Sequence, residues 1–272
     1  MFKIQIPATS ANLGAGFDAL GLALSYYNYV EMEESDVLDI SSADGLQVPT
    51  DEKNLIYISA KDLYNVCGKK LDGLKLIQTN NIPMARGLGS SSACIIAGLV
   101  GANKMLGNPL TKDDLVDLAA QIEGHPDNTA PALLGGIVTA VFDGKKVHWV
   151  KQEVFTKLKF VAIIPDFELK TDAARACLPK EVSHKDAVYN LSRAALFSAS
   201  LLTGKFECFK AVVKARKGAK KLSSKIDIPQ IEAYLQKHGG KAEVRGIYKR
   251  SMILRSLIKG KGIFKEIESE IV

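Results

Sequence analysis

Residues 81–93 read Asn-Ile-Pro-Met-Ala-Arg-Gly-Leu-Gly-Ser-Ser-Ser-Ala, and this stretch decides how the rest of the chain is interpreted. It lies between a strand-like run, 74–79, and a run of small and apolar residues, 89–105, that is typical of a buried helix. Gly87 and Gly89 allow backbone conformations that other residues avoid, and a helix start offers unpaired N–H groups at the positive end of its dipole. The pattern predicts an anion site suited to a chain of phosphates. The alternative is a loop that only joins a strand to a helix.

Three consecutive serines give this loop a second kind of ligand. Their hydroxyl groups can donate hydrogen bonds, and one hydroxyl can bind Mg²⁺, which prefers hard oxygen ligands. The loop lacks the Gly-Lys-Ser/Thr ending of a Walker A loop, and the chain contains no Gly-x-Gly-x-x-Gly run. A phosphate site here therefore belongs to another class of nucleotide-binding protein.

The overall composition is that of a globular protein. The chain is 47% hydrophobic and 24% charged, which argues against disorder. No apolar run approaches the length of a membrane-spanning helix, and the first residues look like a strand and not like a signal peptide. The four cysteines form no Cys-x-x-Cys pair, which gives no support to a zinc site or to disulfides and favours a reducing, cytoplasmic setting.

Positive charge is concentrated in the last quarter of the chain. The formal net charge is +6, but residues 205–272 hold 17 Lys and Arg against 7 Asp and Glu, so the rest of the chain is acidic. A basic stretch can bind nucleic acid or an anionic surface. We interpret this one as solvated surface, because interleaved aromatic residues and a recognised nucleic-acid-binding module are missing.

Periodicity and turn residues predict alternating strands and helices. We expect strands at 2–7, 26–33, 74–79, 135–142 and 159–165, and helices at 54–66, 89–105, 111–123 and 186–202. Thr111 is the expected N-cap of its helix. Pro7 is expected to end the first strand, and Pro126 prevents the helix before it from continuing. A domain boundary near 150–157 divides the chain into 1–152 and 153–272.

Four segments, in order, resemble the motifs of a known family. Residues 83–93 are similar to the ATP-binding motif of the GHMP kinases, named for galactokinase, homoserine, mevalonate and phosphomevalonate kinases. Three others resemble the homoserine kinase branch: 7–21 (Pro-Ala-Thr-Ser-Ala-Asn-Leu-Gly-Ala-Gly-Phe-Asp-Ala-Leu-Gly), 123–132 (Glu-Gly-His-Pro-Asp-Asn-Thr-Ala-Pro-Ala) and 171–179 (Thr-Asp-Ala-Ala-Arg-Ala-Cys-Leu-Pro). The resemblance covers about residues 1–209.

The resemblance implies an α+β fold with two subdomains. The first, 1–152, is the N-terminal ATP-loop domain; the second, 153–272, is a ferredoxin-like domain that we expect to be incomplete and atypical after about residue 210. The implied enzyme is cytoplasmic and a homodimer, without a membrane or nucleic-acid partner. It phosphorylates L-homoserine with ATP and Mg²⁺ in threonine biosynthesis. The alternatives are a GHMP kinase for another alcohol and an impaired remnant of a homoserine kinase.

The resemblance also assigns the nucleotide and metal ligands. Ser91 should bind Mg²⁺, with Glu123 as its carboxylate partner. The alternative for Glu123 is an exposed glutamate at a helix end, but a carboxylate is disfavoured there without a nearby cation. The ATP-binding residues are Pro83, Met84, Ala85, Arg86, Gly87, Leu88, Gly89, Ser90, Ser91, Ser92 and Ala93.

The substrate-binding residues implied by the resemblance are Asn12, Asp18, Asp127 and Arg175. Carboxylate and amide oxygens bind an amino group, so Asp18 and Asp127 should face the amino group of the substrate. Arg175 should bind its carboxylate through the planar guanidinium; the alternative is a surface arginine. Asn12 and Asp18 can also cap a turn, and the two roles are compatible.

No general base is evident from the sequence. The resemblance implies Glu123 and Asn128 as catalytic residues, because the asparagine at this place in homoserine kinases is associated with the reacting hydroxyl. Asp127 lies where some GHMP relatives have a catalytic aspartate. We interpret His125 as a structural residue that precedes Pro126.

The resemblance ends near Phe209. The family should next show an Asp-Arg-Leu-His segment, and later a glycine-rich motif close to Ser-Gly-Ala-Gly-Pro-Thr, and neither is present. The break coincides with the onset of positive charge. We interpret the sequence after about residue 210 as frame-shifted or replaced; genuine divergence is the alternative.

We therefore predict that the chain as given is poorly soluble or weakly active. An incomplete second domain would expose an apolar face and open strand edges, and the missing motif supports the nucleotide site in the family. A reading frame that restores a Ser-Gly-x-Gly-Pro-Thr segment should raise both soluble yield and homoserine-dependent ADP release when the two forms are expressed side by side. Full activity of the present chain would show that its C-terminal part is a functional substitute.

Overall fold

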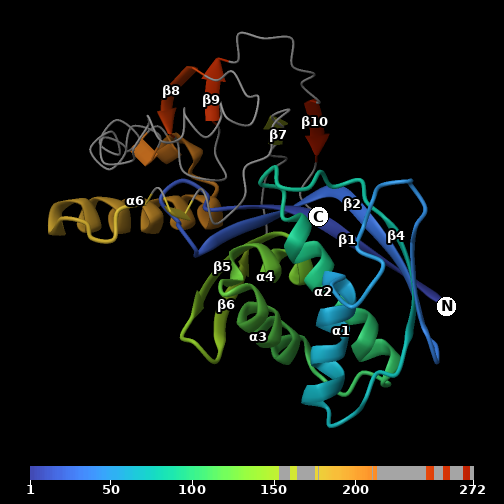
Figure 1. Cartoon of the computed structure of the whole chain (residues 1–272). Helices are drawn as coiled ribbons and strands as arrows, with labels where there is room; N and C mark the ends of the chain where they lie inside the picture. Colours follow the sequence, from blue (N-terminus) through green and yellow to red (C-terminus); the bar gives the residue numbers. More distant parts are fainter. Residues whose placement is uncertain are drawn as a thin grey trace.

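The structure, a computed structural model, describes residues 1–152, 160–163, 175–176, 178–209, 211–212, 243–247, 254–257 and 266–269. Residues 1–152 form a mixed sheet with helices gathered on one of its sides, an α+β architecture (Figure 1). The strands are β1 (Phe2–Ala11), β2 (Leu20–Glu34), β3 (Leu38–Ser42), β4 (Leu74–Thr79), β5 (Ile137–Phe142) and β6 (Val147–Gln152). The helices are α1 (Leu55–Val66), α2 (Ser90–Met105), α3 (Lys112–Glu123) and α4 (Pro126–Leu134).

The sheet is organised around β2, its longest strand. β1 pairs antiparallel with β2 along its length, and the other edge of β2 is shared between β5 near its start and β4 near its end. β3 lies parallel to β4, and β6 lies antiparallel to β5. The strand order is therefore β3-β4-β2-β5-β6, with β1 on β2. β1 contacts α2 and α4, and β2 contacts α4. The loop between β1 and β2 therefore lies near these two helices.

One expectation about β1 is wrong. Pro7 was expected to end the strand, yet β1 continues to Ala11, with a register shift between Pro7 and Ala8. A bulge of this kind accommodates a residue that cannot donate a ladder hydrogen bond. The extension carries Thr9 into the interior, where it is fully buried.

The core lies between the sheet and helices α1 and α2. Leu22, Met32 and Leu76 of the sheet pack against Leu63 and Leu99 of the helices. Helix α2 is buried along most of its length, as the run of small and apolar residues predicted. This burial fixes the position of its first turn. Residues 83–93, which were predicted to bind phosphate and are called the phosphate loop below, lead into that turn.

The N-cap of α3 confirms the prediction for Thr111, and α1 has a side-chain cap that was not predicted. Asn54 accepts hydrogen bonds from the backbone N–H groups of Ile56 and Tyr57, and Thr111 forms a capping box with Asp114. In the same first turn of α3, Asp113 Oδ1 accepts a hydrogen bond at 3.0 Å from the indole Nε1 of Trp149 on β6. Helix α3 is thus tied to β6.

Helix α4 was missed by the sequence prediction. Helix α3 does end at Glu123, with Gly124 as a left-handed C-cap, but Pro126 then starts a new helix. Proline is favoured at the first helical position, where its missing N–H has no helical acceptor to lose. The tight connection places the end of α3 beside the start of α4.

The C-terminal part is described only in segments. β7 (Phe160–Ile163) pairs antiparallel with β10 (Glu266–Ser269), and β8 (Glu243–Ile247) pairs with β9 (Leu254–Leu257). Helix α6 (His184–Thr203) confirms the predicted helix 186–202, and a short 3₁₀ helix, η1 (Phe206–Cys208), follows it. Most of the predicted boundary region, 150–157, lies outside the described residues, which resume at 160 after residue 152, so the two domains remain a prediction. Among the described helices, none combines the length and apolar character needed to cross a membrane.

Candidate active site

The phosphate loop leads directly into the first turn of α2. Gly89 is the N-cap of this helix with φ 68°, and Gly87 and Ala85 also have positive φ values, 75° and 53°. A Cβ atom on Gly89 would lie 1.9 Å from Thr9 Oγ1, so glycine is required there for space as well as for conformation. The loop therefore wraps closely around the start of α2, where the unpaired N–H groups of the helix point.

Arg86 adds an unsatisfied positive group to the loop. Its Nη1 atom is buried and has no hydrogen-bond partner among the described residues. A buried guanidinium N–H without an acceptor is costly, and a phosphate oxygen is a suitable acceptor. The helix N-terminus and Arg86 together give this loop the groups that an anion site would need.

Glu123 lies across from the loop serines. Ser91 Oγ donates to Glu123 Oε2 at 3.3 Å, and Ser92 Oγ donates to Glu123 Oε1 at 3.2 Å. Ser91 is exposed whereas Ser92 is buried. Burial raises the pKa of Glu123, and the nearby charge of Asp127 adds to this, although His125 and the two serines oppose it. A half-buried carboxylate beside two hydroxyl groups is a fitting ligand set for a hard cation.

The start of α4 lies against β2 at an unusually short distance. A Cβ atom on Gly21 would lie 1.7 Å from the backbone oxygen of Asp127, so only glycine allows the approach. Asp127 is 1% exposed, and its Oδ1 lies 2.6 Å from His125 Nδ1. Burial alone would lower the pKa of His125, but the hydrogen bond and charge of Asp127 outweigh it and raise that pKa. His125 is the N-cap of α4, which agrees with a structural role.

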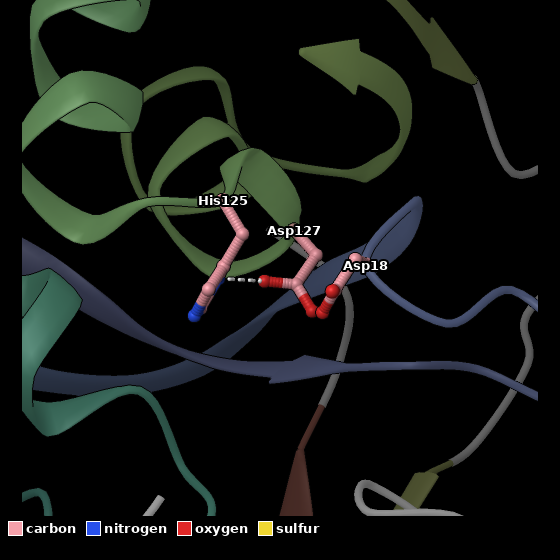
Figure 2. Close-up of side chains that lie close together, drawn as sticks. All are labelled: Asp18, His125 and Asp127. Atoms are coloured by element: carbon pink, nitrogen blue, oxygen red, sulfur yellow. Dashed lines mark hydrogen bonds and ion pairs between the residues drawn. The ribbon is translucent and has the colours of Figure 1, made fainter. Parts of the chain in front are cut away.

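Asp18 faces this pair from the loop after β1. Figure 2 shows the carboxylate groups of Asp18 and Asp127 pointing toward each other, with His125 on the far side of Asp127. One ligand atom from each of the three residues lies within 4.8 Å of the other two. The second oxygen of Asp127, Oδ2, is buried without a hydrogen-bond partner among the described residues. Two facing carboxylates of this kind suit a cationic group.

Arg175 supplies one such cation. Its Nη1 and Nη2 atoms lie 3.0 and 2.6 Å from the two carboxylate oxygens of Asp18, a bidentate ion pair. Its Cζ lies over the ring of Phe17, 5.2 Å from the ring centroid. The sequence predicted both residues as substrate ligands but not that they bind each other. They are 157 positions apart in the chain, and nothing in the sequence pattern indicates the contact.

The turn that holds Asp18 depends on Asn12. The backbone N–H of Asp18 donates to Asn12 Oδ1 at 2.8 Å, and both residues have positive φ values, 60° and 55°. The alternative considered for these residues, a turn cap, is therefore present. Asn12 is 2% exposed, and its contact with substrate remains a prediction. Strained conformations of this type are found at functional sites.

The structure brings together the predicted residues from four distant segments. The loop serines hydrogen-bond to Glu123. Asp18 forms an ion pair with Arg175 and faces Asp127 (Figure 2). Asn128 lies beside Asp127, with its Nδ2 3.4 Å from Asp127 Oδ1. The sequence analysis missed Thr9, whose hydroxyl contacts Asn128. The only available signal was its place inside the segment 7–21.

Comparisons with known proteins agree with this geometry. Residues 54–136 match the family model of the GHMP kinases N terminal domain, which defines the class of the fold. Homoserine kinase from Caldicellulosiruptor bescii is 44% identical over 218 residues, which are 79% of this chain and 71% of that protein. Homoserine kinase from Clostridium beijerinckii is 46% identical over 221 residues, 79% of this chain and 72% of that protein.

A solved structure extends the comparison to the fold. The crystal structure of homoserine kinase from Cytophaga hutchinsonii is 33% identical, with a TM-score of 0.67, and the match covers 74% of this chain and 67% of that one. The chain belongs to the homoserine kinase family of GHMP kinases. The aligned share of this chain is close to what a resemblance confined to residues 1–209 gives.

The position of Glu123 gives a prediction with two opposite effects. Glu123→Gln is expected to lower turnover by more than about tenfold, because it removes the charge that would hold a metal. The same change should stabilise the nucleotide-free protein at neutral pH. Burial raises the pKa of the Glu123 carboxyl above 4.5 in the folded protein. Protonation of Glu123 therefore stabilises the folded state fully below about pH 4.5, and this stability is lost as the pH rises through the folded-state pKa. Glutamine has no such loss.

The measurement is urea unfolding of both proteins at several pH values from 4 upward, together with steady-state turnover. The stability advantage of Glu123→Gln should grow with pH, whereas Glu52→Gln, an exposed glutamate away from the site, should change neither quantity. Wild-type turnover in Glu123→Gln would reduce Glu123 to a helix-end residue.

Proposed function

We propose that this chain is an ATP-dependent kinase that phosphorylates L-homoserine to O-phospho-L-homoserine, as its relatives' names indicate for them. The observation that carries the proposal is the pairing of two sites of opposite character. The first is the phosphate loop, in which Arg86 Nη1 has no hydrogen-bond partner within the part of the chain that the structure describes. The second is the charged set of Asp18, Asp127 and Arg175. A nucleoside triphosphate fits the first site, and an amino acid with a hydroxyl group fits the second.

Residues 83–93 would bind the phosphates of ATP. The N–H groups at the start of α2 and the loop backbone would donate to phosphate oxygens, and Arg86 would neutralise part of their charge. Ser91 and Glu123 would hold Mg²⁺, since both offer hard oxygens and lie within hydrogen-bond distance of each other. When bound, Mg²⁺ supplies Lewis-acid stabilisation of the phosphate charge.

The amino acid would bind by exchange of ion pairs. Its ammonium group would take the place of the guanidinium beside Asp18 and would also satisfy the unpaired oxygen of Asp127. Arg175 would then turn to the carboxylate of the substrate, a group that its planar guanidinium binds in the same bidentate way. Asn12 would support this arrangement by fixing Asp18.

The phosphoryl transfer itself would depend on positioning and charge. Asn128 would accept a hydrogen bond from the hydroxyl of the substrate and aim its oxygen at the γ-phosphate. His125 is engaged with Asp127, so we assign it to orientation of that carboxylate and not to proton abstraction. The new bond joins the substrate oxygen to the γ-phosphorus as its bond to the leaving ADP breaks. The hydroxyl proton would leave late, to an oxygen of the transferred phosphoryl group or to water, as expected for a loose transition state. A homodimer in the cytoplasm, acting in threonine biosynthesis, completes the proposal.

The proposal is tested by a coupled assay of ADP release with ATP and a series of alcohols. L-homoserine should be the preferred acceptor, and analogues that lack either the amino or the carboxylate group should lose more than about tenfold in kcat/KM, because one buried charge would stay unpaired. Preference for an uncharged alcohol would replace homoserine by another acceptor. ATP binding without transfer to any alcohol would favour an impaired kinase.

The two loop serines give a sharper test of the metal site. Both contact Glu123, but only Ser91 is exposed to a solvated cation. Ser91→Ala should therefore need more Mg²⁺ for half-maximal activity, by about tenfold, and should bind ATP less well than Ser92→Ala. Mg²⁺ titrations of both variants decide the matter: equal Mg²⁺ dependence would remove Ser91 as a metal ligand.

A further inference from the structure

Thr9 lies where the two halves of the proposed active site meet. Its backbone N–H donates to the oxygen of Leu88 at 3.1 Å, which ties β1 to the phosphate loop. Its hydroxyl donates to Asn128 Oδ1 at 2.9 Å, which ties β1 to α4. The same hydroxyl lies so close to Gly89 that a Cβ atom there would be 1.9 Å away. One side chain therefore contacts the phosphate loop and Asn128 together.

The side-chain amide of Asn128 is held at both ends. Thr9 donates to its oxygen, and its nitrogen lies 3.4 Å from Asp127 Oδ1, to which it donates. A rotation of the amide by half a turn would place its oxygen against the Asp127 carboxylate and repel it. The two contacts thus select one orientation, in which the amide oxygen keeps a second lone pair for another donor.

Thr9 cannot itself bind substrate, because it is 0% exposed whereas Asn128 is half-buried. We propose that Thr9 is a positioning residue of the kinase, whose hydroxyl orients Asn128 toward the hydroxyl of the acceptor and fixes the distance between that acceptor and the phosphate loop. The proposal rests on the proposed function for the nature of the acceptor. The contacts of Thr9 are independent of it.

The test compares Thr9→Val, which removes the hydroxyl and keeps the shape, with Thr9→Ser, which keeps the hydroxyl. Thr9→Val should lower kcat by about tenfold to a hundredfold, since small misplacements of reacting groups have effects of this order, and should leave the KM for ATP within about threefold. Thr9→Ser should retain kcat within about threefold of wild type.

Thr129→Val is the matched control. Thr129 lies next to Asn128 on α4 and is equally buried, but its hydroxyl has no hydrogen-bond partner among the described residues. Removing it changes the same kind of group in the same region without touching the amide of Asn128. Its kcat should stay within about twofold of wild type. An equal loss in Thr9→Val and Thr129→Val would mean that any buried hydroxyl here matters for packing, and would overturn the proposal.

A double substitution separates positioning from general damage. In the Asn128→Ala background, Thr9→Val should cause no further loss of kcat, because its target is gone. A full additional loss would show that Thr9 acts elsewhere, and the proposal would be wrong. Thr9→Ala serves in the same comparison if Thr9→Val unfolds, which urea unfolding of each variant establishes.

A readout without turnover keeps the test independent of the proposed function. In NMR spectra of the full chain, the side-chain NH₂ protons of Asn128 should exchange with water faster in Thr9→Val than in wild type and in Thr129→Val. Loss of the Thr9 contact to the amide oxygen frees the amide to rotate away from Asp127, which accepts from its NH₂ group. Unchanged exchange would overturn the role of Thr9. If the wild type uses another alcohol, the kinetic arms are run with that alcohol, and only the choice of homoserine fails.

Discussion

The unpaired N–H groups at the start of α2 are the constraint on which the rest of the site depends. The helix is buried along most of its length from Ser92 onward, so the position of its first turn is fixed, and negative charge is favoured at its positive end. In the loop before the helix, Gly87 and Gly89 have positive φ values and no side chains. An anion could therefore approach the N–H groups of the helix closely. Glu123 is the last residue of α3, at the negative end of that helix, and it contacts Ser91 in the first turn of α2. A cation would stabilise its carboxylate there.

Charge balance explains the second half of the site in the same way. Asp18 and Asp127 face each other, and Asp127 Oδ2 has no hydrogen-bond partner within the described part of the chain. Arg175 neutralises Asp18, and His125 Nδ1 lies 2.6 Å from Asp127 Oδ1. A zwitterion that enters such a site brings one charge for each sign, so it can exchange partners without leaving a buried charge unpaired.

The sequence predicted local structure well where a single segment contains the cause. The buried helix at 89–105 and the Thr111 cap depend on neighbouring residues, and the structure has both. Predictions about proline were less successful, because Pro7 is absorbed by a bulge and Pro126 starts a helix. The contacts of Arg175 and Thr9 join residues more than a hundred positions apart, and no periodicity reports on such pairs. The nature of the C-terminal part after about residue 210 stays a prediction.

The contact between Trp149 and Asp113 makes one part of this molecule visible on its own. Trp149 is the single tryptophan of the chain, and it lies on β6, at the end of the sheet order, with its indole bound to α3. Its emission therefore reports the integrity of the sheet edge that supports α3 and, through α3, Glu123. Circular dichroism averages over every residue, so a difference between the two signals on heating would reveal whether residues 1–152 melt separately from the basic C-terminal part.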